Sequence, residues 1–109
     1  MNSSNVKNKS LFGLTLMLIF SALITSPVSA ADVDAGKAKA MICAGCHGAN
    51  GISGSPNIPN LAGQKAGYLA KALRDFKSGA RQNGMMASVV PMIQESDINN
   101  IAAYYESLK

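Results

Sequence analysis

The sequence predicts an all-α protein in which three main helices are joined by irregular loops. Apolar residues recur at the i, i+3, i+4, i+7 spacing of an amphipathic helix in two stretches, 64–78 and 97–108. A third stretch, 35–46, is rich in alanine, which favours helix. Almost no segment shows the alternation of apolar and polar residues that a half-buried strand requires. We therefore expect one small helical domain.

The N-terminal 30 residues have the layout of a secretory signal peptide. A polar start with two lysines precedes an apolar run from Leu11 to Ile24, and a small-x-small cleavage pattern ends at Ala30. The apolar run is shorter than the roughly 20 residues that span a bilayer. We expect cleavage after Ala30, export to the periplasm, and a mature domain of residues 31–109. The protein would associate with a membrane only if this segment is retained as an anchor.

Composition limits the size and the partners of this domain. Without the N-terminal 30 of its 109 residues, the chain keeps no Trp and few aromatic residues, so its own core is marginal. A buried apolar group would supply the missing core volume. The net charge of +4 falls to +2 once Lys7 and Lys9 are removed. Such a mild balance argues against a nucleic-acid partner.

The first helix is expected from about Ala35 to Cys46, with Asp34 as its N-cap. Gly36 is unusual there, because glycine costs about 1 kcal/mol relative to alanine inside a helix. Two explanations stay open. Another helix approaches closely at Gly36, or the first turn is frayed.

Two irregular stretches separate the helices. The first, from Gly48 to Gly63, is rich in glycine, proline and asparagine, and its length indicates a functional loop or one wrapped around something. The second runs from Ala80 to Glu95.

The other two helices are predicted by their apolar faces and end signals. One runs from about Gln64 to Ser78 and ends at Gly79; the other runs from about Asp97 to Leu108 with Ser96 as N-cap. Their apolar faces consist of Leu69, Ala72, Leu73 and Phe76 in the former, and Ile98, Ile101, Ala102, Tyr105 and Leu108 in the latter.

The stretch from Cys43 to His47 reads C-x-x-C-H, the attachment signature of a c-type haem. Each thiol can form a thioether with one porphyrin vinyl group, and the histidine then lies under the iron as a ligand. A disulfide site of the thioredoxin kind accompanies a βαβ pattern, which is missing here. Zinc needs about four ligands, whereas the chain has two cysteines and one histidine. We expect one covalent haem c per chain.

The second face of the iron needs another ligand or stays open. No second histidine exists, and a methionine thioether is the natural candidate because it favours reduced iron. Met85, Met86 and Met92 all precede the last helix, whereas Met41 is badly placed to reach round the ring. On this ground all three of the clustered methionines remain candidates.

Over essentially all of 31–109, the chain resembles the class I cytochromes c. It is most similar to small single-haem cytochromes c553 and to one domain of the di-haem cytochromes c4. The matching blocks are CAGCHG (43–48), PNLAGQ (59–64), YL (68–69), FKSG (76–79), RQN (81–83) followed by Met86, and IAAYY (101–105).

The resemblance implies a class I cytochrome c fold, with helices and loops wrapped around one covalent haem. By position, it implies Cys43 and Cys46 as the thioether attachments, His47 as the proximal iron ligand, Met86 as the distal iron ligand, and Pro59 as the carbonyl acceptor that orients the histidine.

The resemblance also bears on three further positions: a rival ligand, an explanation of Gly36 and one departure from the family pattern. Met85 is the main rival of Met86, Gly36 would let the first helix cross the last, and Gly84 stands where the family often has proline.

The expected function is electron transfer without catalytic residues. An iron with both axial positions filled exchanges one electron between redox partner proteins more readily than it binds a substrate. The alternative is a haem enzyme or gas sensor whose sixth position is open or labile. A third class is a redox or structural module without haem that uses a Cys43–Cys46 disulfide.

Overall fold

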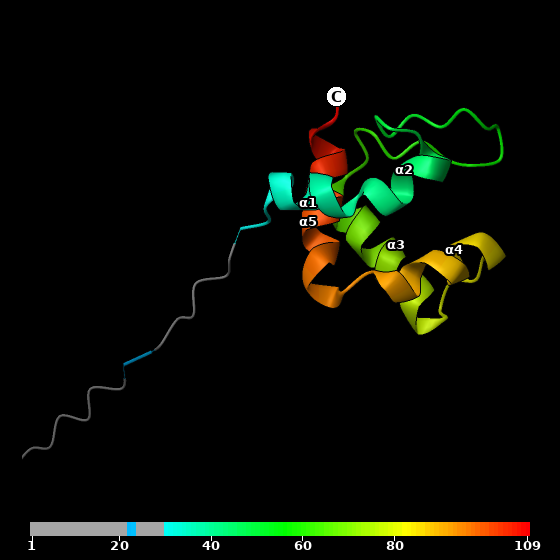
Figure 1. Ribbon diagram of the computed structural model, residues 1–109. Helices are drawn as coiled ribbons and strands as arrows, with labels where there is room; N and C mark the ends of the chain where they lie inside the picture. Colours follow the sequence, from blue (N-terminus) through cyan, green and yellow to red (C-terminus); the bar gives the residue numbers. More distant parts are fainter. Residues whose placement is uncertain (1–21, 24–29) are drawn as a thin grey trace, which may run out of the picture.

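The computed structural model describes residues 22–23 and 30–109, and helices are the regular elements of this described part (Figure 1). In chain order they are α1 (Val33–Lys39), α2 (Met41–His47), α3 (Ala66–Ser78), α4 (Gly84–Val89), the short 3₁₀ helix η1 (Val90–Met92) and α5 (Glu95–Ser107). No strand occurs among these described residues, and the all-α prediction is confirmed.

The predicted signal peptide lies almost wholly outside the described residues. Within the described part, no helix is long and apolar enough to cross a membrane.

Helices α1 and α5 cross with their backbones in contact (Figure 1). A Cβ added at Gly36 would lie only 1.9 Å from the carbonyl oxygen of Asn100 in α5. The backbone N–H of Asp32 donates to Oδ1 of Asn100 at 2.8 Å, and Lys39 forms an ion pair with Asp97 at 3.4 Å. The first explanation of Gly36, close approach of another helix, is therefore confirmed.

The single first helix expected from Ala35 to Cys46 is two helices in the structure. Helix α1 begins earlier, because Asp32 rather than Asp34 caps it by accepting from the N–H of Ala35 at 3.0 Å. At the buried Ala40 the chain turns, and the N–H of Cys43 bonds the Ala40 carbonyl three residues back, at 2.9 Å. This tight turn separates α1, which packs across α5, from α2.

Helix α3 ends as predicted, at Gly79 in the left-handed conformation with φ 81°. It begins at Ala66 rather than Gln64, where the side chain of Glu106 in α5 accepts from the Ala66 N–H at 3.1 Å. The Glu106 side chain thus takes the place of an N-cap side chain, since Lys65 at the N-cap position makes no such hydrogen bond.

The region from Ala80 to Glu95, expected to be irregular, contains α4 and η1. The side chain of Asn83 caps α4 by accepting from two backbone N–H groups. The N-cap predicted at Ser96 is also wrong: α5 begins at Glu95 after Gln94, whose carbonyl accepts from the N–H of Asp97 at 3.0 Å.

The predicted apolar face of α5 is buried. The buried members are Ile98, Ile101, Ala102 and Tyr105, while Leu108 is half-buried at the helix end.

The segment between α2 and α3 has no helix or strand, which confirms the predicted loop. It is closed on itself at Gly51, whose carbonyl accepts from the N–H groups of Leu61 at 2.8 Å and Ala62 at 3.0 Å. These hydrogen bonds fold the loop back, so that Pro59 lies next to the end of α2.

Candidate haem-binding site

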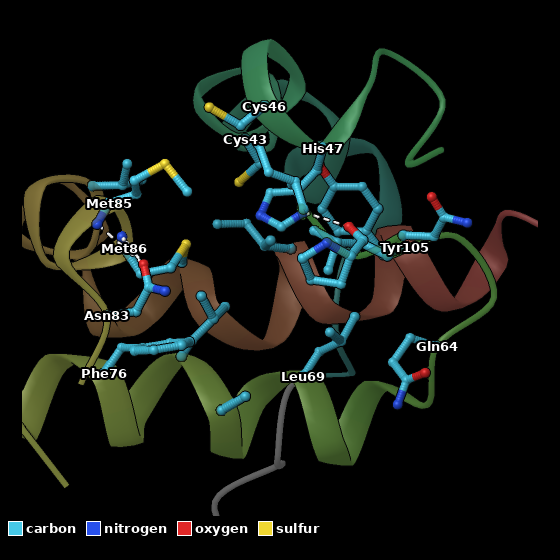
Figure 2. Close-up of a pocket in the computed structure, with 18 of the residues that line it drawn as sticks. Cys43, Cys46, His47, Gln64, Leu69, Phe76, Asn83, Met85, Met86 and Tyr105 are labelled. Atoms are coloured by element: carbon cyan, nitrogen blue, oxygen red, sulfur yellow. Dashed lines mark hydrogen bonds between the residues drawn. The ribbon is translucent and has the colours of Figure 1, made fainter. Parts of the chain in front are cut away.

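A cavity of about 580 Å³ lies between α2, α3, α4, α5 and the 48–65 loop (Figure 2). Its wall is mostly apolar, and its volume is within the range of about 300–1,000 Å³ typical of cofactor sites. The apolar face predicted for α3 lines this cavity through Leu69, Ala72, Leu73 and Phe76. That face therefore serves a binding site as well as the core.

Both cysteines contribute to one wall of the cavity, from consecutive turns of α2 (Figure 2). Residues three apart on a helix share a face, so their sulfurs lie on the same side. Cys43 is buried and Cys46 is exposed, and both thiols are free. Burial raises the pKa of the Cys43 thiol, which a hydrogen bond with Tyr105 partly opposes. The wall thus presents two thiols to the edge of whatever fills the cavity.

His47 ends α2 and is 8% exposed. Its Nδ1 lies 2.7 Å from the carbonyl oxygen of Pro59. A proline carbonyl can only accept, so Nδ1 carries the hydrogen and donates it. The lone pair then remains on Nε2, where it is available to a metal. The loop that returns at Gly51 therefore sets both the tautomer and the ring orientation.

The three candidate methionines and Met41, which was considered badly placed, have different environments. Met86, in α4, is half-buried, packs against the core and lines the cavity on the side opposite His47 (Figure 2). Its neighbour Met85 also reaches the cavity, but its side chain is 57% exposed. Met41 and Met92 are 76% and 62% exposed and do not line the cavity. The structure therefore brings Met85 and Met86 to the site and leaves Met41 and Met92 outside it.

Two wall residues were not singled out for the site from sequence. Tyr105, expected only as core, is 2% exposed, lines the cavity together with Cys43, and donates from its hydroxyl to the Ala40 carbonyl at 3.5 Å. Asn83 lies between Met86 and Phe76 in the cavity wall (Figure 2). Asparagine is one of the residue types favoured at helix N-caps, so Asn83 itself was a local signal for the start of α4.

The residues around the cavity fit a covalently attached haem. A flat apolar group would find two thiols at one edge, an imidazole nitrogen on one face and a thioether sulfur on the other. Nitrogen and sulfur donors of this kind are the axial ligands of low-spin haem iron. Within the described residues, no group of three or more His, Cys, Asp or Glu side chains gathers to bind a metal ion directly.

The family described as Cytochrome c matches residues 33–109. Cytochrome c4 of Pseudomonas aeruginosa is 42% identical over 102 residues, which cover 94% of this chain and 49% of that protein. Cytochrome c-554(548) of Halomonas halodenitrificans is 42% identical over 81 residues, covering 72% of this chain and 98% of that protein.

Among solved structures, reduced cytochrome c4 from Pseudomonas stutzeri superposes with a TM-score of 0.69 at 38% identity. The match covers 73% of this chain and 47% of that one. The chain thus spans about half the length of the cytochromes c4 that it matches, and almost the whole of the Halomonas protein.

Proposed function

Because this chain belongs to the cytochrome c family, in class I, we propose that it is a mono-haem electron carrier. Cys43 and Cys46 would hold one haem c by thioethers, and His47 and Met86 would hold its iron from the two sides of the cavity. The observation that supports this most is the placement of His47 and Met86 on opposite sides of one cavity, with Cys43 on the wall between them (Figure 2).

The bound haem would supply reversible one-electron exchange at its iron. The protein's own contribution is to hold the donors. The Pro59 carbonyl keeps the imidazole of His47 in one orientation and increases its basicity. The thioether of Met86 favours the reduced metal. With both axial positions taken by side chains, no position is left for a substrate, which favours a carrier over an enzyme.

Partner proteins would meet the molecule at the mouth of the cavity. Ile42, Tyr68 and Met85 line the cavity and are 42%, 52% and 57% exposed. Exposed apolar residues of this kind are common where transient protein contacts form. We infer that redox partners dock over these three side chains and exchange electrons through the haem edge near Cys46.

Export to the periplasm completes the proposal, since the thiols of bacterial cytochromes c meet haem outside the cytoplasm. The N-terminal 30 residues would direct this export and then be removed. Mass spectrometry of periplasmic protein should find Ala31 at the N-terminus with one haem attached. A retained N-terminal segment would instead indicate a membrane-anchored form.

The ligand pair is tested by two single substitutions at adjacent residues. The ferric protein should show a weak far-red sulfur-to-iron band, and the ferrous protein should show sharp low-spin α and β bands. Met86→Ala should abolish the far-red band and lower the potential, while Met85→Ala should leave both nearly unchanged. Optical spectroscopy and a redox titration measure the two effects.

The opposite pattern would reassign the ligand to Met85. A high-spin spectrum of the wild-type protein, or ready binding of carbon monoxide, would instead favour an open sixth position and the enzyme or sensor alternative. Colourless protein from a host that matures cytochromes c would exclude the haem altogether.

A further inference from the structure

We propose that Asn83 is a positioning residue that selects Met86, rather than the adjacent Met85, as the iron ligand. The inference rests on the proposed function, since it concerns how the chain presents one of two neighbouring thioethers to the cavity.

The cap that Asn83 forms is specific in its geometry. Its Oδ1 accepts from the backbone N–H of Met85 at 3.0 Å and of Met86 at 3.1 Å. Its own carbonyl accepts from the N–H of Ala87 at 2.8 Å, the first hydrogen bond of the helix. The backbone of Asn83 is extended, at φ −158° and ψ 128°. One side chain therefore determines which residue is the second and which is the third of α4.

The register of α4 decides which methionine enters the cavity. Consecutive residues of an α-helix point about 100° apart. In the observed register Met86 packs against the core, while Met85 is 57% exposed at the rim. A slip of one residue would move Met85 toward the position of Met86. Both side chains are chemically identical, so nothing in the thioether itself distinguishes them.

Besides this cap, two other contacts support the register: Met86 packs against the core, and the Ser88 hydroxyl donates to the Met85 carbonyl at 2.7 Å. Helix α4 has six residues, none of them buried, and isolated helices of that length are unstable in water. Among the described helices it packs mainly against η1 and α3. By contrast, α3 and α5 each have 13 residues and buried side chains. The Asn83 cap is thus the main local constraint on the turn that bears the ligand.

The test uses haem-loaded Asn83→Ala and Asn83→Asp. Added imidazole competes with Met86 for the ferric iron, and its apparent affinity reports how firmly the thioether is held. An N-cap contributes about 1 kcal/mol, which corresponds to about a fivefold change in an equilibrium constant. Asn83→Ala should therefore bind imidazole about fivefold more tightly. Asn83→Asp keeps the accepting oxygen and should restore the wild-type affinity.

Asp32→Ala is the matched control. Asp32 caps α1 through a comparable hydrogen bond, 3.0 Å from the Ala35 N–H, and does not line the cavity. It should lower the unfolding temperature without changing imidazole affinity. If Asp32→Ala raises the affinity as much as Asn83→Ala does, the effect is general loosening and the proposal is wrong.

The identity of the bound thioether is read by NMR of the ferrous protein, where the methyl protons of a ligating methionine are strongly shifted by the ring current. Asn83→Ala should show a second shifted methyl signal, and adding Met85→Leu should remove it. A single unchanged signal together with wild-type imidazole affinity in Asn83→Ala would overturn the proposal. Absence of any such signal in the wild-type protein would refute the Met86 ligation itself, a separate failure.

Discussion

Replacing Gly36 by alanine tests the helix crossing on which the fold depends. The added Cβ would lie 1.9 Å from the carbonyl oxygen and 2.4 Å from the carbonyl carbon of Asn100. Ordinary van der Waals contact begins at 3.4 Å. The obstacle is backbone, which cannot rotate away as a side chain can. Helices α1 and α5 must therefore separate, and the hydrogen bond from Asp32 to Asn100 is stretched with them.

The size of the effect follows from two opposing contributions. Overpacking of this kind costs about 1–3 kcal/mol, and a backbone obstacle places Gly36→Ala at the upper end. Alanine returns about 1 kcal/mol through its higher helix propensity. The expected net loss is about 2 kcal/mol. For a domain of this size, that lowers the unfolding temperature by about 8–16 °C.

The assay is thermal unfolding of the haem-loaded protein, followed by far-ultraviolet circular dichroism. Gly67→Ala is the control, because Gly67 is an exposed glycine in α3 with no atom within 4 Å of an added Cβ. It should gain at most about 0.5 kcal/mol, because Gly67 is the second residue of α3 and not a mid-helix residue. The two glycine-to-alanine changes should thus shift stability in opposite directions. A Gly36→Ala protein as stable as the wild type would refute the close crossing.

Two further predictions concern the first residue of α4 and the buried Tyr105. Gly84→Pro should raise the free energy of unfolding by about 0.4–1 kcal/mol, as measured by denaturant titration. Proline suits the first position of a helix, and the residue before it, Asn83, already has the extended backbone that proline requires. A loss of stability would show that the backbone at the start of α4 is not the one described. Burial raises the pKa of Tyr105 above its ordinary value of about 10. The folded protein therefore retains a proton that the unfolded chain releases, so stability is complete below about pH 10 and falls as the pH rises further. Tyr105→Phe should flatten this fall, as measured by denaturant unfolding at pH 9 and pH 11; an equal fall in both proteins would contradict the assignment.

The experiments at the two methionines and at Asn83 address different steps of one argument. Met86→Ala asks whether a thioether fills the sixth position, whereas Asn83→Ala asks what holds that thioether there. A protein can pass the first test and fail the second. In that case the packing of Met86 against the core, rather than the cap, would set the choice.

Local signals in the sequence were sufficient for several parts of this protein. The apolar periodicities predicted α3 and α5, because a helix buries one face whatever its neighbours are. Gly79 predicted the end of α3, because the left-handed backbone conformation at a helix end costs glycine less energy than any other residue. The C-x-x-C-H stretch indicated the cofactor, because the spacing of thiols and imidazole is itself the chemistry of attachment.

Tertiary structure decided what depends on contacts between distant segments. At the buried Ala40 the chain breaks between α1, which crosses α5, and α2, and the first N–H of α3 is bonded by Glu106, forty residues away. Helix α4 was not predicted because it is short and has no buried residue, so its sequence shows no periodic apolar face. Local pattern alone left Met85 and Met86 equivalent; the family resemblance favoured Met86, and the fold gives the two side chains different environments. Both side chains reach the cavity, and the register of the capped turn packs Met86 against the core while Met85 stays 57% exposed.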